Sequence, residues 1–365
     1  MASSTAASDT GGTPLLEISD LTVTIGSGQN ALTAVRGIDL TLRRGESLGV
    51  VGESGAGKSL SMLSVTSLLP PSARIGGSVK LKGTELVGLG HRALRKIRGA
   101  EVGMIFQDPM TSLNPVFTVG RQVGEAVRIH NPRMSRREIH EAAIDLLAAV
   151  AIPSPKERMG SYPFELSGGM RQRVMIAIAI ANNPALLIAD EPTTALDVTI
   201  QAQILRLLQR LADERDMALV LITHDLGVIA GMVDRVAVMY AGRIVEERPT
   251  DELFADPRHP YTKALLACIP RPDEANTRIA GIPGTPAILR PAPRGCAFAP
   301  RCAEAIAECK ETDPHLEGVE GARVACIVAT PPGMTGPRIP AQRLPGGTTP
   351  QTPPQRPAPT AGGAE

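Results

Sequence analysis

The stretch Gly52-Glu-Ser-Gly-Ala-Gly-Lys58-Ser59 decides the fold, because it fits the pattern G-x-x-x-x-G-K-[ST]. It follows the short apolar run Ser47–Val51, and a helix should come after it, which is the context that a phosphate-cradling loop requires. Gly55 and Gly57 permit backbone turns that direct N–H groups at phosphates, and the helix presents its positive end to them. The alternative is an ordinary glycine-rich turn. We expect ATP contacts from the following residues: Gly52, Glu53, Ser54, Gly55, Ala56, Gly57, Lys58, Ser59 and Leu60.

Two adjacent carboxylates supply the second half of the site. Asp190 and Glu191 end the apolar run Leu186–Ala189, which places them at the sheet edge where ligands bind. Asp190 can hold Mg²⁺ through water together with the Ser59 hydroxyl, and Glu191 can polarise the water that attacks the γ-phosphate. A solvated strand end is the alternative for the pair alone. With the upstream loop in the same sheet, the pair predicts a Mg²⁺-dependent nucleotide hydrolase.

The order of predicted elements indicates an α/β fold of three layers with a parallel-sheet core. Leu15–Thr24 and Gly37–Leu42 alternate like antiparallel strands, and residues from about 108 to 165 form a proline-bracketed helical insertion with helical periodicity at Arg137–Val150. The remaining expected elements are a helix at Gly168–Ala181, a strand at Ala185–Ala189, a helix at Ile200–Asp216 and a strand at Ala218–Thr223.

Composition limits the function classes. The hydrophobic share of 43% and charged share of 21% are those of a globular chain, and no run reaches the roughly 18 apolar residues of a membrane span. The net charge of +1 leaves no global attraction to nucleic acid, which is not expected as a partner. The start lacks a secretion signal, which predicts a reducing cytosol without disulfides. Residues 1–13 and 331–365 are expected to be disordered tails around a 14–255 domain and a small separate region at 256–330.

Leu166-Ser167-Gly168-Gly169-Met170-Arg171-Gln172-Arg173 resembles the signature sequence of ABC ATPases. Gln107 matches the Q-loop of this superfamily, Ala195-Leu-Asp197 its D-loop and His224 its switch histidine. The resemblance implies that Gln107 contacts the metal or attacking water, and that His224 orders Glu191 and bonds the γ-phosphate. It also implies that Ser167, Gly168 and Gly169 close over the ATP of a second ABC ATPase subunit, either a related partner or a second copy.

One position departs from the superfamily pattern. ABC ATPases usually stack adenine on an aromatic residue just after the first strand, and Thr24–Ile25 stands at that place here. Apolar contact with Ile25 would then replace stacking, at a loss of about 1 kcal/mol of aromatic preference.

Two further segments, Phe106–Pro115 and His259-Pro-Tyr-Thr-Lys-Ala-Leu-Leu266, resemble the ATP-binding subunits of oligopeptide/dipeptide/nickel importers. The resemblance implies a peripheral ATPase on the cytoplasmic face of the cell membrane that powers peptide import. Its partners would be two membrane-spanning permease subunits and an extracytoplasmic solute-binding protein. The alternatives are the same role for nickel or another small solute, an ABC exporter, and a soluble ABC ATPase that is not coupled to transport.

Four of the five cysteines follow one another as Cys296-x5-Cys302-x6-Cys309-x16-Cys326. Zinc usually prefers shorter Cys-x2–4-Cys pairs, and these wider spacings suit a larger cluster. In the resembling family this pattern implies a [4Fe-4S] cluster, with zinc or unligated buried thiols as alternatives. Cys268 is expected to be an apolar core residue outside the cluster.

Overall fold

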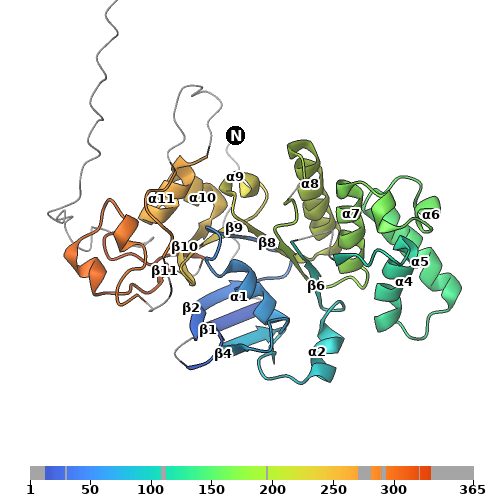
Figure 1. Ribbon diagram of the computed structural model, residues 1–365, viewed down its shortest axis with the longest axis horizontal. Helices are drawn as coiled ribbons and strands as arrows, with labels where there is room; N and C mark the ends of the chain where they lie inside the picture. Colours follow the sequence, from blue (N-terminus) through green and yellow to red (C-terminus); the bar gives the residue numbers. More distant parts are fainter. Residues whose placement is uncertain are drawn as a thin grey trace, which may run out of the picture.

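The computed structural model describes residues 13–28, 31–107, 112–194, 196–269, 281–287, 289, 293–319 and 321–329. The two expected tails lie outside the described residues apart from Thr13, and so do the first four residues of the helical insertion at 108–111. The described chain forms two sheets with helices around them (Figure 1). The predicted α/β class is confirmed.

The larger sheet has eight strands in the order β11-β12-β10-β9-β3-β8-β7-β6. Its five-stranded part from β9 to β6 is parallel, and the other three strands add to it antiparallel. The parallel strands are covered on both faces, since every residue of β7, β8 and β9 is buried. The bounds are β3 (Ser47–Val51), β6 (Val102–Ile105), β7 (Leu186–Asp190), β8 (Ala218–Thr223), β9 (Arg235–Tyr240), β10 (Arg243–Pro249), β11 (Glu317–Val319) and β12 (Ala322–Val324).

The smaller sheet is the antiparallel subdomain that alternation predicted. Its strands follow the order β2-β1-β4-β5, with β1 (Leu16–Ile25) between β2 (Leu32–Leu42) and β4 (Ala73–Leu81), and β5 (Thr84–Glu85) at one edge. Residues Leu21 and Val23 of β1 point inward and share a hydrophobic cluster with Met62 and Val65 of helix α1 (Lys58–Val65). The β subdomain therefore packs beside the phosphate-binding loop.

The helical insertion lies at one end of the molecule, on the right of Figure 1. Its longest helix begins with a reciprocal cap, because Ser135 accepts from the Glu138 backbone while the Glu138 carboxylate accepts from Ser135 N–H. This helix runs over Arg136–Ala149, one residue from the predicted range. The insertion contains α4 (Val119–His130), α5 (Arg136–Ala149), α6 (Pro155–Arg158) and the 3₁₀ turn η2 (Pro163–Glu165). The helices that precede and follow it are α2 (His91–Ile97), α7 (Gly168–Ala179), α8 (Val198–Arg215) and α9 (Leu226–Ile229).

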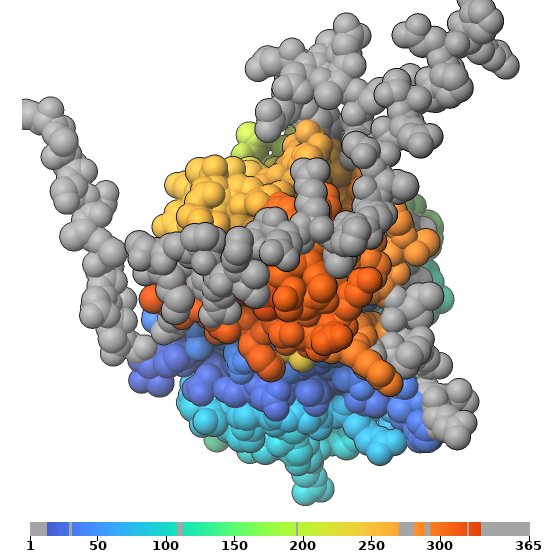
Figure 2. Space-filling model, turned by 90° about the vertical axis from the view of Figure 1, so that its left-hand side faces the viewer, coloured from blue at the N-terminus to red at the C-terminus, as the bar shows by residue number. Residues whose placement is uncertain are grey.

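The C-terminal region does not stand apart from the ATPase core. Its strand β12 pairs with β10 and so extends the large sheet, and Phe298 and Tyr261 belong to the same hydrophobic cluster as the parallel strands. Figure 2 shows this region, in orange, lying directly against the blue β subdomain. Its helices and turns are α10 (Thr250–Ala255), α11 (Pro260–Ala267), η3 (Ala299–Arg301) and η4 (Ala307–Lys310).

A buried network of ion pairs joins the parallel strands, the β subdomain and the C-terminal region. Glu247 of β10 is fully buried and pairs with Arg235 of β9 and Arg323 of β12. Arg235 also donates to Glu46 at 2.6 Å and to the Thr41 carbonyl at 2.7 Å. The region that was expected to be separate is therefore held by charge as well as by strand pairing.

Candidate nucleotide-binding and hydrolysis site

The phosphate-binding loop lies between β3 and α1 as its sequence predicts. Lys58 begins α1 and is 6% exposed, and its Nζ donates to the carbonyls of Gly52 at 2.7 Å and Glu53 at 3.1 Å. Burial lowers the pKa of Lys58, while the nearby Glu191, Asp190 and Glu53 carboxylates raise it. The ammonium group is thus held inside the curve of the loop.

Gly57 shows why the loop needs glycine. Its φ is +99°, a left-handed conformation that other residues rarely adopt, and a Cβ there would lie 2.8 Å from the Ala34 carbonyl oxygen. Gly55 also has a positive φ, of +80°, but nothing lies within 4 Å of the position a Cβ would take. The loop is therefore closed toward the β subdomain at Gly57 and open at Gly55.

Two oxygen donors suited to Mg²⁺ meet at the start of α1. The Ser59 hydroxyl donates to Asp190 Oδ1 at 2.9 Å, although 131 residues separate them in sequence. Burial raises the pKa of Asp190, against which the Ser59 hydrogen bond and Lys58 act. A hydroxyl and a carboxylate in contact are the hard oxygen ligands that Mg²⁺ takes, so these residues fit the predicted metal.

Glu191 is the meeting point of the predicted catalytic residues. Its carboxylate accepts from Gln107 Nε2 at 2.9 Å and from the Thr194 hydroxyl at 3.0 Å, and its other oxygen lies 3.1 Å from His224 Nδ1. Its backbone φ of +45° is in the left-handed region, a strained conformation for a non-glycine residue. Burial raises its pKa, but the hydrogen bonds from His224 and Thr194 outweigh this and leave the pKa of Glu191 below its ordinary value. Glu191 is therefore an ionised, oriented carboxylate.

The signature and D-loop residues lie at other helix starts. Ser167 caps α7 by accepting from Met170 N–H at 3.3 Å, and Asp197 caps α8 by accepting from Ile200 N–H at 3.0 Å. Within the described part of the chain, no hydrogen bond joins Ser167, Gly168 or Gly169 to the phosphate-binding loop. The structure thus brings Lys58, Ser59, Asp190, Glu191, Gln107 and His224 together and leaves the signature exposed.

Two residues of the site had no signal in the phosphate-binding motif itself. Tyr261 Oη accepts from Glu53 N–H at 2.9 Å, and Arg301 makes two bonds to the Glu53 carboxylate. Tyr261 lies in the His-Pro-Tyr-Thr stretch, which carries part of the family resemblance, and Arg301 directly precedes Cys302 in the cysteine-bearing segment. The position expected at the adenine, Ile25, ends β1 and is partly buried against the cluster beneath that sheet.

The four spaced cysteines come together. Cys296, Cys302, Cys309 and Cys326 line one small cavity of about 10 Å³ beside His259 and Phe298, and Cys296 N–H donates to the Cys309 carbonyl at 2.8 Å. Burial raises the pKa of Cys296 to about 11 and that of Cys302 to about 12, so both thiols are protonated at neutral pH in this state. Among the described residues, no three His, Cys, Asp or Glu side chains are grouped closely enough to hold a metal ion.

Cys268 lies apart from these four cysteines, at the end of α11. Its Sγ donates to the Ala264 carbonyl at 3.2 Å, and the residue is partly exposed where a core position was expected.

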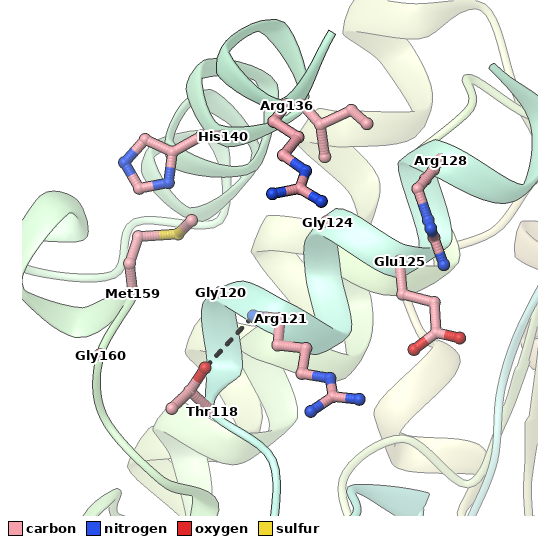
Figure 3. Close-up of a pocket in the computed structure, with 11 residues that line it drawn as sticks. Thr118, Gly120, Arg121, Gly124, Glu125, Arg128, Arg136, His140, Met159 and Gly160 are labelled. Carbon is pink, nitrogen blue, oxygen red and sulfur yellow. Dashed lines mark hydrogen bonds between the residues drawn. The ribbon is translucent and has the colours of Figure 1, made fainter. Parts of the chain in front are cut away.

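A larger cavity of about 960 Å³ opens in the helical insertion, away from Lys58 and Glu191. Figure 3 shows Arg121, Glu125 and Arg128 on α4, with Arg136 and His140 of α5 on its other side. All five side chains are exposed, and the three arginines give the hollow a basic character.

The fold, the phosphate-binding loop and the order of the motifs define an ATP-binding cassette protein. Residues 35–194 match the family model described as "ABC transporter", and residues 245–309 match that described as "Oligopeptide/dipeptide transporter, C-terminal region". The chain therefore belongs to the ABC transporter ATP-binding proteins that carry the oligopeptide/dipeptide transporter C-terminal region. Across the described residues, every helix is too short or too polar to span a bilayer.

Curated relatives are similar over most of the chain. The probable peptide ABC transporter ATP-binding protein y4tR of Sinorhizobium fredii is 51% identical over 86% of this chain and 94% of its own length. The oligopeptide transport ATP-binding protein OppD of Salmonella typhimurium is 49% identical over 86% and 93%. The protein of the same name in Mycobacterium tuberculosis is 50% identical over 86% of this chain, which spans only 52% of that relative's length.

Solved structures agree on the cassette fold. The ATP-binding cassette MJ0796, in a dimeric post-hydrolysis state bound to ADP and Pi, has a TM-score of 0.58 and 30% identity over 64% of this chain and 98% of its own. The cbiO1 protein of Clostridium perfringens, described as part of the ABC transporter complex cbiONQ, has a TM-score of 0.58 and 26% identity over 67% and 91%.

Proposed function

We propose that this chain is the ATP-hydrolysing subunit that powers an ABC importer for di- and oligopeptides at the cytoplasmic face of the cell membrane. The observation that carries the proposal is the convergence of Gln107, Thr194 and His224 on the Glu191 carboxylate, next to Lys58. In this proposal residues 14–255 form the nucleotide-binding domain, with a helical subdomain at about 108–165, and residues 256–330 form the importer-type C-terminal region.

The chemistry assigned to the residues is hydrolysis of the γ-phosphate. Lys58 binds the β- and γ-phosphates, and Glu191 accepts a proton from the water that attacks in line, as ADP leaves. His224 and Gln107 hold Glu191 in place through their hydrogen bonds. Ser59 and Asp190, with Gln107 near them, would hold Mg²⁺, whose charge offsets that of the phosphate oxygens when it is bound.

The proposal requires a second ATPase subunit, related or identical. Ser167, Gly168 and Gly169 start a helix that points its free N–H groups outward, which makes them an anion site for the partner's ATP. The MJ0796 cassette, whose solved structure is a dimer bound to ADP and Pi, supports this arrangement.

Coupling to two membrane-spanning permease subunits is assigned to the helical insertion. The cavity between α4 and α5 offers a basic hollow for a permease segment. Phe106, beside Gln107, and Phe164 are exposed large apolar side chains that could add to such a contact. An extracytoplasmic solute-binding protein would then deliver the cargo. The relatives' names favour peptides over nickel.

Uptake measurements test the cargo. In cells that depend on this gene, we expect labelled di- or oligopeptide uptake to fall to background when Glu191→Gln replaces the wild type at equal expression, because ATP binds without being split. Nickel uptake should not change. Loss of nickel uptake alone would favour the small-solute alternative, and unchanged uptake of every solute would favour an ATPase that is not coupled to transport.

We also propose that Cys296, Cys302, Cys309 and Cys326 hold a [4Fe-4S] cluster. The support is that all four thiols line one cavity, and that their sequence spacings are wider than the short Cys-x2–4-Cys pairs that zinc usually prefers. The cavity of about 10 Å³ has room for about one water molecule, so the loops must open to admit a cluster. When bound, such a cluster cross-links the loops and can change charge by one electron.

Metal analysis of protein purified without oxygen tests the cluster. We expect about four iron and four sulfide per chain in the wild type and in Cys268→Ala, because Cys268 does not line the cavity. The Cys302→Ala protein should lose most of both. One zinc per chain, or no metal in protein made with ample iron, would contradict the cluster.

A further inference from the structure

The C-terminal region contacts the phosphate-binding loop at Glu53, the second residue of the loop. Arg301 Nη1 lies 2.7 Å from Glu53 Oε2, and its Nη2 lies 2.9 Å from Glu53 Oε1, a two-bond pair across 248 residues of sequence. Tyr261 Oη accepts from the Glu53 backbone N–H at 2.9 Å. Both the side chain and the main chain of Glu53 are therefore bound by residues outside the cassette motifs.

The Arg301 side chain is also held by contacts other than those to Glu53. Its side chain is 4% exposed, and it donates to the carbonyls of Pro283 at 2.9 Å and Ile282 at 3.2 Å. Hydrogen bonding to Glu53 raises the pKa of Arg301, so the guanidinium stays charged at all working pH values. A planar guanidinium with most of its donors occupied has little freedom to turn away from the loop.

Tyr261 stands on an aromatic cluster. Its ring centroid lies 4.6 Å from that of Tyr240 and 5.3 Å from that of Phe298. The whole chain has three Tyr, five Phe and no Trp, so this junction concentrates a scarce residue type. Behind it, the His259 imidazole caps α11 by accepting from Tyr261 N–H at 3.0 Å. The tyrosine hydroxyl is thus placed by packing and by the helix start.

The negative charge near the phosphate-binding loop means that the Arg301–Glu53 pair affects nucleotide binding. Lys58 faces the carboxylates of Glu191, Asp190 and Glu53. ATP brings further negative charge to this place, so an unpaired Glu53 would weaken its binding. Arg301 offsets the charge of one of these three carboxylates.

We propose that Arg301 and Tyr261 are positioning residues for the phosphate-binding loop, and that the Arg301–Glu53 pair sets the affinity for MgATP. This inference rests on the proposed ATPase function. It gives the C-terminal region a part in nucleotide binding, since the contact runs from the turn η3 directly to the loop.

The test compares Arg301→Gln, the double variant Arg301→Gln/Glu53→Gln and the control Lys263→Gln in the intact transporter. Lys263 is an exposed residue of the same region, paired with Glu304. We expect Arg301→Gln to weaken the binding of a non-hydrolysable ATP analogue in the presence of Mg²⁺ by about tenfold, and to raise KM for ATP by about the same factor. This is the size of one lost charge-assisted hydrogen bond, and kcat should change little. The double variant should regain most of the affinity, and Lys263→Gln should match the wild type.

A merely structural role predicts a different pattern. Affinity of Arg301→Gln within twofold of the wild type, or a double variant as weak as the single, would overturn the inference. If Arg301→Gln does not fold, Tyr261→Phe removes only the acceptor for Glu53 N–H, and an unchanged KM there would overturn it equally. A wild-type protein that binds no ATP would instead refute the proposed function and is recognised by the same titration.

Discussion

Glu191→Gln is expected to reduce ATP hydrolysis by the assembled transporter by about 10²- to 10³-fold while ATP still binds. The amide keeps the shape of the carboxylate: its oxygen can accept from Gln107 and Thr194, and its NH₂ can donate to His224 Nδ1. The substitution therefore removes the charge and proton acceptor but leaves the hydrogen-bonded geometry. Phosphate release at saturating MgATP gives the rate, and retention of radiolabelled ATP gives the binding.

Glu214→Gln is the matched control, because Glu214 is an exposed glutamate of α8 that pairs with Arg210 at 3.7 Å. It should hydrolyse ATP at the wild-type rate. Hydrolysis by Glu191→Gln within a few-fold of the wild type would show that another group activates the water.

Glu247→Ala is expected to lower the free energy of unfolding by about 3 kcal/mol or more, because it leaves the buried guanidinium of Arg235 and the partly buried guanidinium of Arg323 without their shared carboxylate. The ion pairs that join strand β10 to β9 and to β12 would both be lost. Urea unfolding followed by circular dichroism measures the change, since the chain has no tryptophan.

The exposed pair of Glu17 with Lys80, at 3.9 Å, supplies the comparison. Glu17→Gln should change stability by less than about 1 kcal/mol, as exposed pairs generally do. Equal losses for the two variants would mean that the Glu247 network contributes no more than a surface contact.

Much of the catalytic site could be predicted from sequence because its parts are short and local. The run Ser47–Ser59 is a strand, a turn and a helix start, and each step has a residue pattern of its own. Asp190 ends β7 and Glu191 follows it; β7 is parallel to β3 with β8 between them, so sheet geometry alone places both carboxylates at the sheet edge where Lys58 lies. The structure adds what spacing cannot, namely that Gln107 reaches Glu191 and that the Glu191 backbone is left-handed.

The C-terminal region was less predictable, for a physical reason. Arg301 meets Glu53 across 248 residues, and the partner of an arginine at such a separation depends on the whole fold. The strands β11 and β12 have three residues each and carry no alternation to detect. The grouping of the four cysteines was expected from their spacing, whereas the small size of their cavity follows only from how Phe298 and His259 pack beside them.

The pairing of β12 with β10 also bears on solubility. Without β12, the buried strand β10 would present a row of unpaired N–H and C=O groups at the rim of the large sheet, and such an open rim invites association with other chains. The strand that ends the sheet is instead β11, which has three residues and begins with the charged Glu317. The C-terminal region, which contacts the phosphate-binding loop through Arg301 and Tyr261, thus also covers a sheet edge that would otherwise favour aggregation.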